Sequence, residues 1–370
     1  MTINTAQRRP GTDPIDDVSV RVRGLTKDFP LGGLFSRRSM RAVDNVDFDI
    51  PRGTIVALVG ESGSGKSTVA RALARLERPT SGSIVVGGRD VLKTERSAAS
   101  RRYRGTVQMV FQDPFGSLNP AHRVEHFLER PLRIHGKART RQEVRRRSAE
   151  LMRTVGLTED MLDSYPHELS GGQRQRVSIA RALAVDPEII LADEPTSMLD
   201  VSVRIGILNL MARLRDERGI SMLFITHDLA SARYVADTTL VMFAGALVEG
   251  GESLELMQNP SHPYTRLLLS AVPDPARTVR YDPVQRARLR QAVLEPTTCP
   301  WQGPDCSTSV PVRHTVGPDH WVRCHLYAPQ VAAASNPLLT DHDSGVGSEL
   351  DSTFDSAHDS APASTRKAAR

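Results

Sequence analysis

A glycine-rich loop between a buried strand and a helix constrains this chain more than any other feature of its sequence. The residues "GTIVALVG" (53–60) form a nearly continuous apolar run, which is typical of a strand buried on both faces of a sheet. The loop "GESGSGKST" (60–68) follows at once and fits the pattern G-x-x-x-x-G-K-[S/T], and "TVARALARL" continues with helical periodicity. This order predicts a loop whose backbone N–H groups surround a phosphate chain at the start of a helix.

Two side chains of this loop have distinct predicted roles. Lys66 should reach the β- and γ-phosphates of a nucleotide, and the Ser67 hydroxyl should bind Mg²⁺. A Gly/Ser-rich turn without a ligand would fit the bare pattern, but the flanking strand and helix favour the phosphate loop. The nucleotide-binding residues predicted from the loop are Gly60, Glu61, Ser62, Gly63, Ser64, Gly65, Lys66, Ser67 and Thr68.

Acidic residues and a histidine end two further buried-strand patterns. "EIILADE" ends on Asp193 and Glu194, and "SMLFITHD" contains His227 near its end. A helical pattern that stops at Gly219 separates the two, which predicts a βαβ unit and a parallel sheet. Because ligands bind at the carboxyl ends of parallel strands, we expect Asp193 to bind Mg²⁺, Glu194 to act as general base and His227 to sense the γ-phosphate. Without the loop, the acids would indicate a helix cap and the histidine a structural role.

Composition limits the class of protein. The chain has 370 residues, of which 39% are hydrophobic and 25% charged, and its formal net charge is +5. It contains no run of 18 apolar residues and no signal-peptide pattern at its N-terminus, so we expect a cytoplasmic protein. The arginine-rich stretch 137–153 has an apolar stripe and is interpreted as a solvated helix face rather than a site for nucleic acid or lipid headgroups.

The stretch "HELSGGQRQRVSIARAL" places Ser170, Gly171 and Gly172 before a helical pattern, where an anion could bind although no nearby residue could act on it chemically. "LSGGQ" is identical to the signature motif of ABC transporter ATP-binding subunits, and the chain resembles that family over about residues 18–272. The resemblance implies two nucleotide domains in a head-to-tail dimer. Ser170, Gly171, Gly172 and Gln173 would then bind the γ-phosphate of an ATP held by the partner's phosphate loop.

The same resemblance assigns three further positions. Gln112, in "MVFQDP", matches the glutamine loop, which would contact Mg²⁺ and the attacking water. Asp200, in "SMLD", matches the D-loop aspartate at the dimer interface, although Met198 stands where the family usually has a small residue. Phe29, in "TKDFP", is the candidate for stacking on adenine, with a plain core role as the alternative.

The resemblance also implies an architecture. The expected fold is an α/β P-loop NTPase: a RecA-like parallel-sheet core, an antiparallel β subdomain, a helical subdomain and a small irregular C-terminal extension. We expect a flexible tail at 1–17, the ATP-binding domain at 18–260 with its helical subdomain at about 114–183, the extension at 261–330 and a disordered tail at 331–370.

Three stretches, "QDPFGSLNP" (112–120), "LDVSVRIGILNLM" (199–211) and "NPSHPYTRLLLSAVP" (259–273), resemble the oligopeptide/dipeptide importer branch. The branch implies an ATPase that drives peptide uptake from the cytoplasmic face of the membrane; nickel, glutathione and some sugars use close relatives. The implied partners are two permease subunits, a second ATP-binding subunit and an extracellular solute-binding protein, with no nucleic acid. A soluble ABC ATPase acting on nucleic acid or ribosomes, a non-hydrolysing regulatory subunit and an exporter subunit are the alternatives.

The chain's cysteines are Cys299, Cys306 and Cys324. Three cysteines do not make a disulfide framework. Their spacing resembles the last three of four cysteines that can hold an iron–sulfur cluster in this branch, but the first would fall near Val293 and is absent. A cluster or Zn²⁺ with His320 or His325 as fourth ligand, or reduced buried thiols, are the open interpretations.

Overall fold

The computed structural model describes residues 17–31, 39–95, 99–270 and 310–327. Its largest element is an eight-stranded sheet with the strands β3 (Ile55–Val59), β6 (Val107–Val110), β7 (Ile189–Asp193), β8 (Ser221–Thr226), β9 (Thr238–Phe243), β10 (Ala246–Glu252), β11 (Arg313–Gly317) and β12 (His320–Arg323). The spatial order is β11-β12-β10-β9-β3-β8-β7-β6. The tail expected at 331–370 and nearly all of the tail expected at 1–17 lie outside the described residues.

The half of this sheet from β9 to β6 is parallel and forms the centre of the molecule. β3 pairs in parallel with β8 and β9, and β7 pairs in parallel with β8 and β6. Every residue of β3, β7 and β8 is buried, as the continuous apolar runs predicted. The carboxyl ends of these strands therefore share one edge, where the loop after β3 lies.

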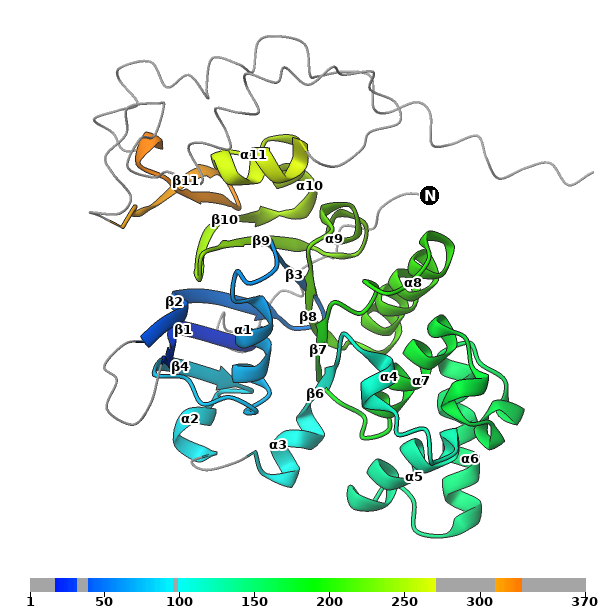
Figure 1. Cartoon of the computed structure of the whole chain (residues 1–370). Coiled ribbons are helices and arrows are strands. Elements are labelled where there is room, and N and C mark those ends of the chain that lie inside the picture. The colour runs from blue at the N-terminus through cyan, green and yellow to red at the C-terminus, as the bar shows by residue number, and fades with distance from the viewer. Residues whose placement is uncertain (1–16, 32–38, 96–98, 271–309, 328–370) are drawn as a thin grey trace, which may run out of the picture.

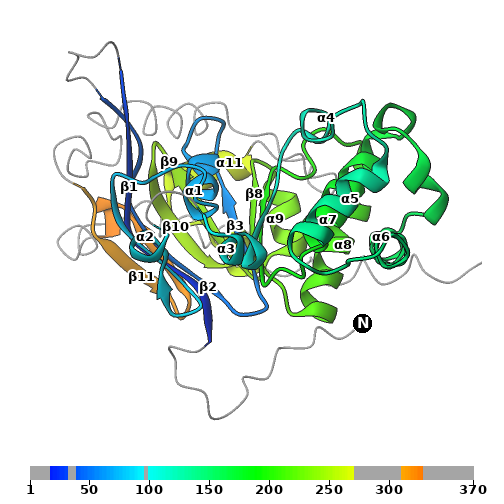
Figure 2. The ribbon, with the colours of Figure 1, turned by 90° about the horizontal axis from the view of Figure 1, so that it is seen from below.

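A second, four-stranded antiparallel sheet covers one side of the molecule. Its order is β2-β1-β4-β5, and its strands are β1 (Val18–Pro30), β2 (Ser39–Pro51), β4 (Ser81–Val86) and β5 (Arg89–Asp90). Helix α1 (Lys66–Leu73) lies between this sheet and the parallel strands (Figures 1 and 2). One buried cluster joins all three, for example through Val22 of β1, Val69 of α1 and Leu223 of β8.

The opposite side of the parallel strands carries the helical subdomain. Its elements are α4 (Pro114–Ser117), α5 (Val124–Ile134), α6 (Arg141–Thr154), η1 (Glu159–Asp163), η2 (Pro166–Glu168) and α7 (Gly171–Leu183). The expected arginine-rich helix is α6, which begins at a complete capping box formed by Thr140 and Glu143. Its apolar stripe is buried, whereas most of its arginines face solvent or carboxylates.

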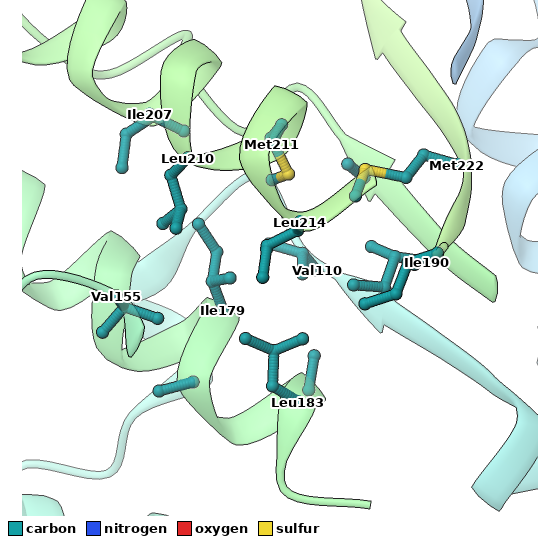
Figure 3. Close-up of a cluster of buried hydrophobic side chains, with 14 of the residues drawn as sticks. Val110, Val155, Ile179, Leu183, Ile190, Ile207, Leu210, Met211, Leu214 and Met222 are labelled. Atoms are coloured by element: carbon teal, nitrogen blue, oxygen red, sulfur yellow. The ribbon is translucent and has the colours of Figure 1, made fainter. Parts of the chain in front are cut away.

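Helix α8 (Val201–Arg218) joins this subdomain to the sheet. It ends at Gly219, in the left-handed conformation, where the sequence predicted its end. Ile179 of α7 faces Met211 and Leu214 of α8, and the cluster continues to Ile190 and Met222 on the sheet (Figure 3). Helix α7, which begins within the LSGGQ motif, thus packs through this cluster against strands β7 and β8, which end at Asp193 and just before His227.

The short elements complete the described chain: α2 (Val91–Thr94), α3 (Arg101–Thr106), α9 (Leu229–Val235), α10 (Ser253–Gln258), α11 (Pro263–Ser270) and η4 (His325–Tyr327). In this described part of the chain, no helix has the length and apolar character needed to cross a membrane.

The expectation of an irregular C-terminal extension is wrong for residues 310–327. There β11 and β12 form an antiparallel hairpin, and β12 pairs with β10, so the extension continues the main sheet. Trp321 lies beside Gly250, where a glycine leaves room for the indole. Frequent Pro and Cys in the preceding stretch obscure this short alternating pattern in the sequence.

Candidate functional site

The phosphate loop has the backbone geometry that its glycines allow. Gly60 and Gly65 have φ values of 156° and 106°, and Gly65 is the N-cap of α1 without a side-chain cap. A Cβ atom at Gly60 would lie 2.2 Å from the Met242 carbonyl oxygen, and one at Gly65 would lie 2.3 Å from that of Ala42. The close approach of β2 and β9 therefore requires both glycines, and the first turn of α1 has no acidic residue to repel an anion.

Lys66 is buried at the base of this loop, with 4% of its surface exposed. Its Nζ donates hydrogen bonds to the carbonyl oxygens of Gly60 at 2.7 Å and Glu61 at 2.6 Å. Burial lowers the pKa of Lys66, and the charges of Glu194 and Asp193 oppose that shift. An ammonium group held by carbonyl dipoles at a helix N-terminus is suited to phosphate oxygens.

Ser67 and Asp193 meet across the site, as the sequence predicted for two ligands of one cation. The Ser67 hydroxyl donates to Oδ1 of Asp193 over 2.9 Å, and Asp193 is buried at the end of β7. Burial raises the pKa of Asp193, while the hydrogen bond from Ser67 lowers it. Neighbouring hydroxyl and carboxylate oxygens are hard ligands of the kind that Mg²⁺ prefers, so these residues fit the ion.

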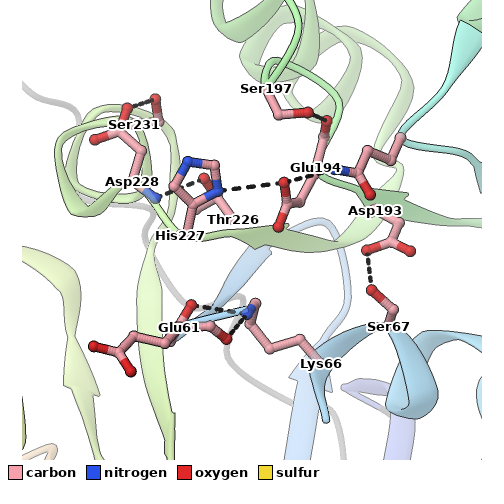
Figure 4. Close-up of polar contacts among 12 residues, drawn as sticks. Glu61, Lys66, Ser67, Asp193, Glu194, Ser197, Thr226, His227, Asp228 and Ser231 are labelled. Atoms are coloured by element: carbon pink, nitrogen blue, oxygen red, sulfur yellow. Dashed lines mark hydrogen bonds and ion pairs between the residues drawn. The ribbon is translucent and has the colours of Figure 1, made fainter. Parts of the chain in front are cut away.

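Glu194 is held in an unusual backbone conformation beside two polar partners (Figure 4). The φ angle of Glu194 is 45°. Its backbone N–H donates to the Ile225 carbonyl oxygen, and its backbone carbonyl oxygen accepts a hydrogen bond from Ser197 Oγ. Its Oε2 lies 3.1 Å from Gln112 Nε2 and 3.3 Å from His227 Nδ1. Strained backbone that neighbouring strands hold in place is typical of functional positions, and here it brings three predicted residues together.

The signature residues lie in a different part of the molecule. Ser170 is the N-cap of α7, and Ser170 and Gln173 form a capping box through bonds of 3.3 and 2.8 Å. Gly172 packs on α8, because a Cβ there would lie 2.3 Å from Cγ1 of Val203. Both overall views place α7 in the helical subdomain, across the sheet from α1 (Figures 1 and 2). The chain's own phosphate loop and signature therefore do not form one site.

The remaining predicted residues occupy the periphery. Asp200 is the N-cap of α8 and is exposed, between Met198 and Val201, whose exposed fractions are 56% and 71%. Phe29 is half-buried near the end of β1, so it is outside the fully buried core, and Lys27 Nζ lies 4.7 Å from its ring centroid. Stacking of Phe29 on adenine stays a prediction.

The cysteine site also stays a prediction. Cys324 is buried directly after β12, next to His325, whereas Cys299 and Cys306 lie outside the described residues. Among the residues with described positions, no three His, Cys, Asp or Glu side chains gather in a way that could hold a metal ion.

Sequence reasoning missed one residue that contacts the loop. Tyr264 of α11 is completely buried, and its hydroxyl accepts a 2.9 Å hydrogen bond from the Glu61 N–H. The signal was present in "NPSHPYTRLLLSAVP", which we used only as a mark of the transporter branch. Nothing in the local pattern indicates that this tyrosine reaches a loop about two hundred residues earlier in the chain.

This chain is similar to known proteins over most of its length. The family model described as "ABC transporter" matches residues 43–197, and the model described as "Oligopeptide/dipeptide transporter, C-terminal region" matches residues 248–309. The oligopeptide transport ATP-binding protein AppF of Bacillus subtilis (strain 168) is 40% identical, over 84% of this chain and 97% of that protein. The dipeptide transport ATP-binding protein DppF of Escherichia coli (strain K12) is 43% identical, over 85% of this chain and 91% of that protein.

Solved structures give the same fold. The ATP-binding cassette MJ0796, in a dimeric post-hydrolysis state bound to ADP and phosphate, superposes with a TM-score of 0.57 at 32% identity. The match covers 63% of this chain and 98% of the cassette. The comparison therefore supports the fold of an ABC nucleotide-binding domain for the matched part of this chain.

Proposed function

Since this chain belongs to the family of ABC transporter ATP-binding proteins, in its oligopeptide/dipeptide branch, we propose that it binds and hydrolyses ATP to drive peptide uptake across a cell membrane. The family and the relatives that transport peptides support the ATPase and the substrate class. One observation on the chain itself carries the chemistry. At a single edge of the sheet, Lys66 and Ser67 face Asp193, Glu194 and His227.

Hydrolysis follows from the positions of these side chains. The loop N–H groups and the Lys66 ammonium bind the phosphates and offset the charge that develops on them. A water oxygen bonds to the γ-phosphorus as the bond to the bridging oxygen of the β-phosphate breaks, giving ADP and inorganic phosphate. The Glu194 carboxylate accepts the proton of this water, and His227, 3.3 Å from it, contacts the γ-phosphate.

Ser67, Asp193 and Gln112 are the residues that we assign to Mg²⁺. When bound, the ion would neutralise charge on the β- and γ-phosphates. Gln112 has a second role, because it lies on the segment that leads from β6 into the helical subdomain and contacts Glu194 directly. A change at the catalytic carboxylate can therefore reach the helices.

The signature residues serve a second nucleotide domain in this proposal. Ser170, Gly171, Gly172 and Gln173 would bind the γ-phosphate on the partner's phosphate loop, and Asp200 would lie at the interface. The exposed apolar side chains beside Asp200, and the exposed Ile205 on the same helix, support a contact surface there. The partner is a second ATP-binding subunit, and a non-identical sibling is the usual arrangement that the branch implies.

The other partners follow from the transporter branch. We propose that the chain lies at the cytoplasmic face of the membrane, attached to two permease subunits, and that an extracellular solute-binding protein delivers the peptide. ATP binding closes the dimer, and closure moves the permeases through the helical subdomain. The cofactors are ATP and Mg²⁺, with a metal at the cysteines as a separate prediction.

The ATPase measurement that tests this proposal compares the full chain alone with the chain assembled with its permeases and sibling subunit. Glu194→Gln should bind ATP but lose at least about 99% of turnover, because the general base is removed without loss of the phosphate contacts. Glu217→Gln, the same change on the exposed face of α8, is the matched control and should leave turnover unchanged. Absence of turnover in the assembled wild type would contradict the ATPase, and normal turnover in Glu194→Gln would contradict its assignment as base.

Iron and zinc analysis of anaerobically purified protein tests the cysteine prediction. A metal content near one equivalent that falls in Cys306→Ser would support it. A content well below one equivalent, with unchanged stability of the variant, would contradict it.

A further inference from the structure

Tyr264 connects the C-terminal extension to the phosphate loop. It lies in the first turn of α11, its side chain is completely buried, and its hydroxyl oxygen accepts a hydrogen bond from the Glu61 N–H at 2.9 Å. Glu61 directly follows Gly60 at the start of the loop. A residue of the extension thus holds the backbone of the segment that encloses the phosphates.

The tyrosine itself is fixed in one orientation. Its ring packs on Phe243, at the end of β9, with ring centroids 4.5 Å apart, and its backbone N–H donates to Nδ1 of His262. Burial raises the pKa of Tyr264 to about 12, so the hydroxyl is neutral at physiological pH and its oxygen accepts from Glu61.

The turn before α11 is held by a buried carboxylate. Glu249 of β10 has no exposed surface, and it accepts hydrogen bonds from the N–H groups of Ser261 at 2.6 Å and His262 at 3.0 Å. Its Oε1 also lies 2.7 Å from His320 Nε2, on β12. The Tyr327 hydroxyl donates to the Ser261 carbonyl oxygen. The sheet and both described parts of the extension therefore determine where Tyr264 stands.

The loop is anchored at two points outside α1. Gly245, in the turn between β9 and β10, donates its N–H to the Ser64 carbonyl oxygen at 3.0 Å, and Tyr264 holds the N–H of Glu61. Within the loop, Lys66 Nζ donates hydrogen bonds to the carbonyl oxygens of Gly60 and Glu61. Without the tyrosine hydroxyl, the first half of the loop would keep the contacts of Lys66, which the phosphates also require, and the hydrogen bond from the Ser64 N–H to the Glu61 carbonyl oxygen within the loop.

We propose that Tyr264 is a positioning residue for nucleotide binding: its hydroxyl holds the Glu61 backbone so that the phosphate loop is already in its binding conformation before ATP arrives. This inference rests on the proposed ATP-binding function. A preorganised loop costs less entropy to order around a ligand, so the hydroxyl contributes to affinity rather than to the chemical step. The C-terminal extension thereby sets the affinity of a site built by the ATP-binding domain.

The substitution Tyr264→Phe tests this directly, because it keeps the ring and removes the acceptor. In the full chain with Mg²⁺, the Kd for ATP from equilibrium dialysis should rise about three- to tenfold, the effect of losing one neutral hydrogen bond. In the assembled transporter, KM for ATP should rise by the same factor while kcat stays within about twofold.

Tyr234→Phe is the matched control. It removes a tyrosine hydroxyl that donates to Asn209 Oδ1 from α9 rather than holding the loop or the turn before α11, and it should leave Kd and KM unchanged. An unchanged Kd in Tyr264→Phe, or an equal rise in Tyr234→Phe, would overturn the proposal. If the wild type itself fails to bind ATP, the proposed function fails instead, and the two failures are therefore distinguishable.

Hydrogen exchange gives a second test that does not depend on the variant folding. In the wild type without nucleotide, the Glu61 amide should exchange at least about tenfold more slowly than an unstructured amide, because it is bonded to a buried hydroxyl. Exchange at the unstructured rate would overturn the proposal.

Discussion

Helices α1 and α7 both have Gly and Ser residues at their N-termini, but these N-termini are organised in opposite ways. At α1 the cap is Gly65, which has no side chain, and the loop before it is held from outside by the turn between β9 and β10 and by Tyr264 of the extension. At α7 the cap is Ser170, and its capping box with Gln173 satisfies backbone N–H groups from within the same turn.

This difference affects how each helix N-terminus could bind a phosphate. The N–H groups of the loop before α1 can be used by a phosphate without breaking a side-chain cap. At α7 an incoming phosphate has to share or replace the bonds that Ser170 and Gln173 make to each other. In the proposed function, the α1 end would therefore bind ATP in a single chain, whereas the α7 end would become a ligand site only when a partner presents ATP to it.

Removal of the cation at the α1 end should have the largest effect. Lys66→Ala should weaken ATP binding by about 10- to 100-fold, because charge-assisted bonds to the phosphates are lost. Equilibrium dialysis of the full chain measures this effect. Lys93→Ala, on the exposed surface of α2, removes the same side chain elsewhere and should have no effect. Equal ATP affinity in Lys66→Ala would mean that the α1 end is not the complete site.

The stability of the protein should also depend on pH through His262, which lies in the turn that positions Tyr264 beside the phosphate loop. Burial lowers the pKa of His262 to about 4, from an ordinary value of 6.5, with the charge of Glu249 opposing the shift. Below about pH 6.5 the unfolded chain takes up a proton at this histidine that the folded chain does not, so stability is highest above that pH and falls towards pH 4. The loss at about pH 5 should be about 2 kcal/mol.

Urea unfolding of the wild type and His262→Asn at about pH 7.5 and pH 5 measures this loss. Asn can still accept the Tyr264 N–H but does not titrate, so the variant should lose less stability on acidification than the wild type. Equal losses in both proteins would show that His262 is not the group responsible. The capping box at α7 contains no titrating group and has no counterpart to this effect.

The substitution Ser170→Ala tests the N-terminus of α7, where Ser170 is the cap. This change should cost about 1 kcal/mol of stability through loss of the cap. It should also lower turnover of the assembled transporter about tenfold, because in the proposed function the hydroxyl donates to the partner's γ-phosphate. ATP binding by the isolated chain should stay unchanged, and a loss of binding there would contradict the division between the two ends.

The smallest effect should come from the capping box of α6. Thr140→Ala removes the equivalent cap of α6, on the solvated arginine-rich helix, and should cost about 1 kcal/mol without changing turnover. An equal loss of turnover in this variant would show that helix stability, and not the Ser170 hydroxyl, explains the effect at α7.

The parts of the molecule that the sequence predicted well are those where one local pattern determines the structure. The buried strands β3, β7 and β8, the end of α8 at Gly219, and the meeting of Ser67 with Asp193 all follow from apolar runs and strand ends. The family resemblance identified Gln112 as a glutamine-loop residue, but it did not predict the contact of Gln112 with Glu194, which spans 82 positions.

The parts that were missed depend on partners distant in the sequence. The bond from Glu61 to Tyr264 spans 203 positions, and that between Glu249 and His320 spans 71. Hairpin β11–β12 is too short to stand out by periodicity, and it is stabilised as a continuation of β10. Long-range contacts of this kind require the fold before they can be seen.

The pairing of β12 with β10 has a practical consequence for the smallest piece of this chain that could fold by itself. The "ABC transporter" match ends at residue 197, before β8, β9 and β10, and the match to the C-terminal region ends at residue 309, before the strands that complete the sheet. A version trimmed at residue 197 would lack β8, β9 and β10, and one trimmed at residue 309 would expose the β10 edge and leave the Glu249 carboxylate without its His320 partner. The folding unit therefore extends at least to Tyr327, well beyond the motifs that define the family.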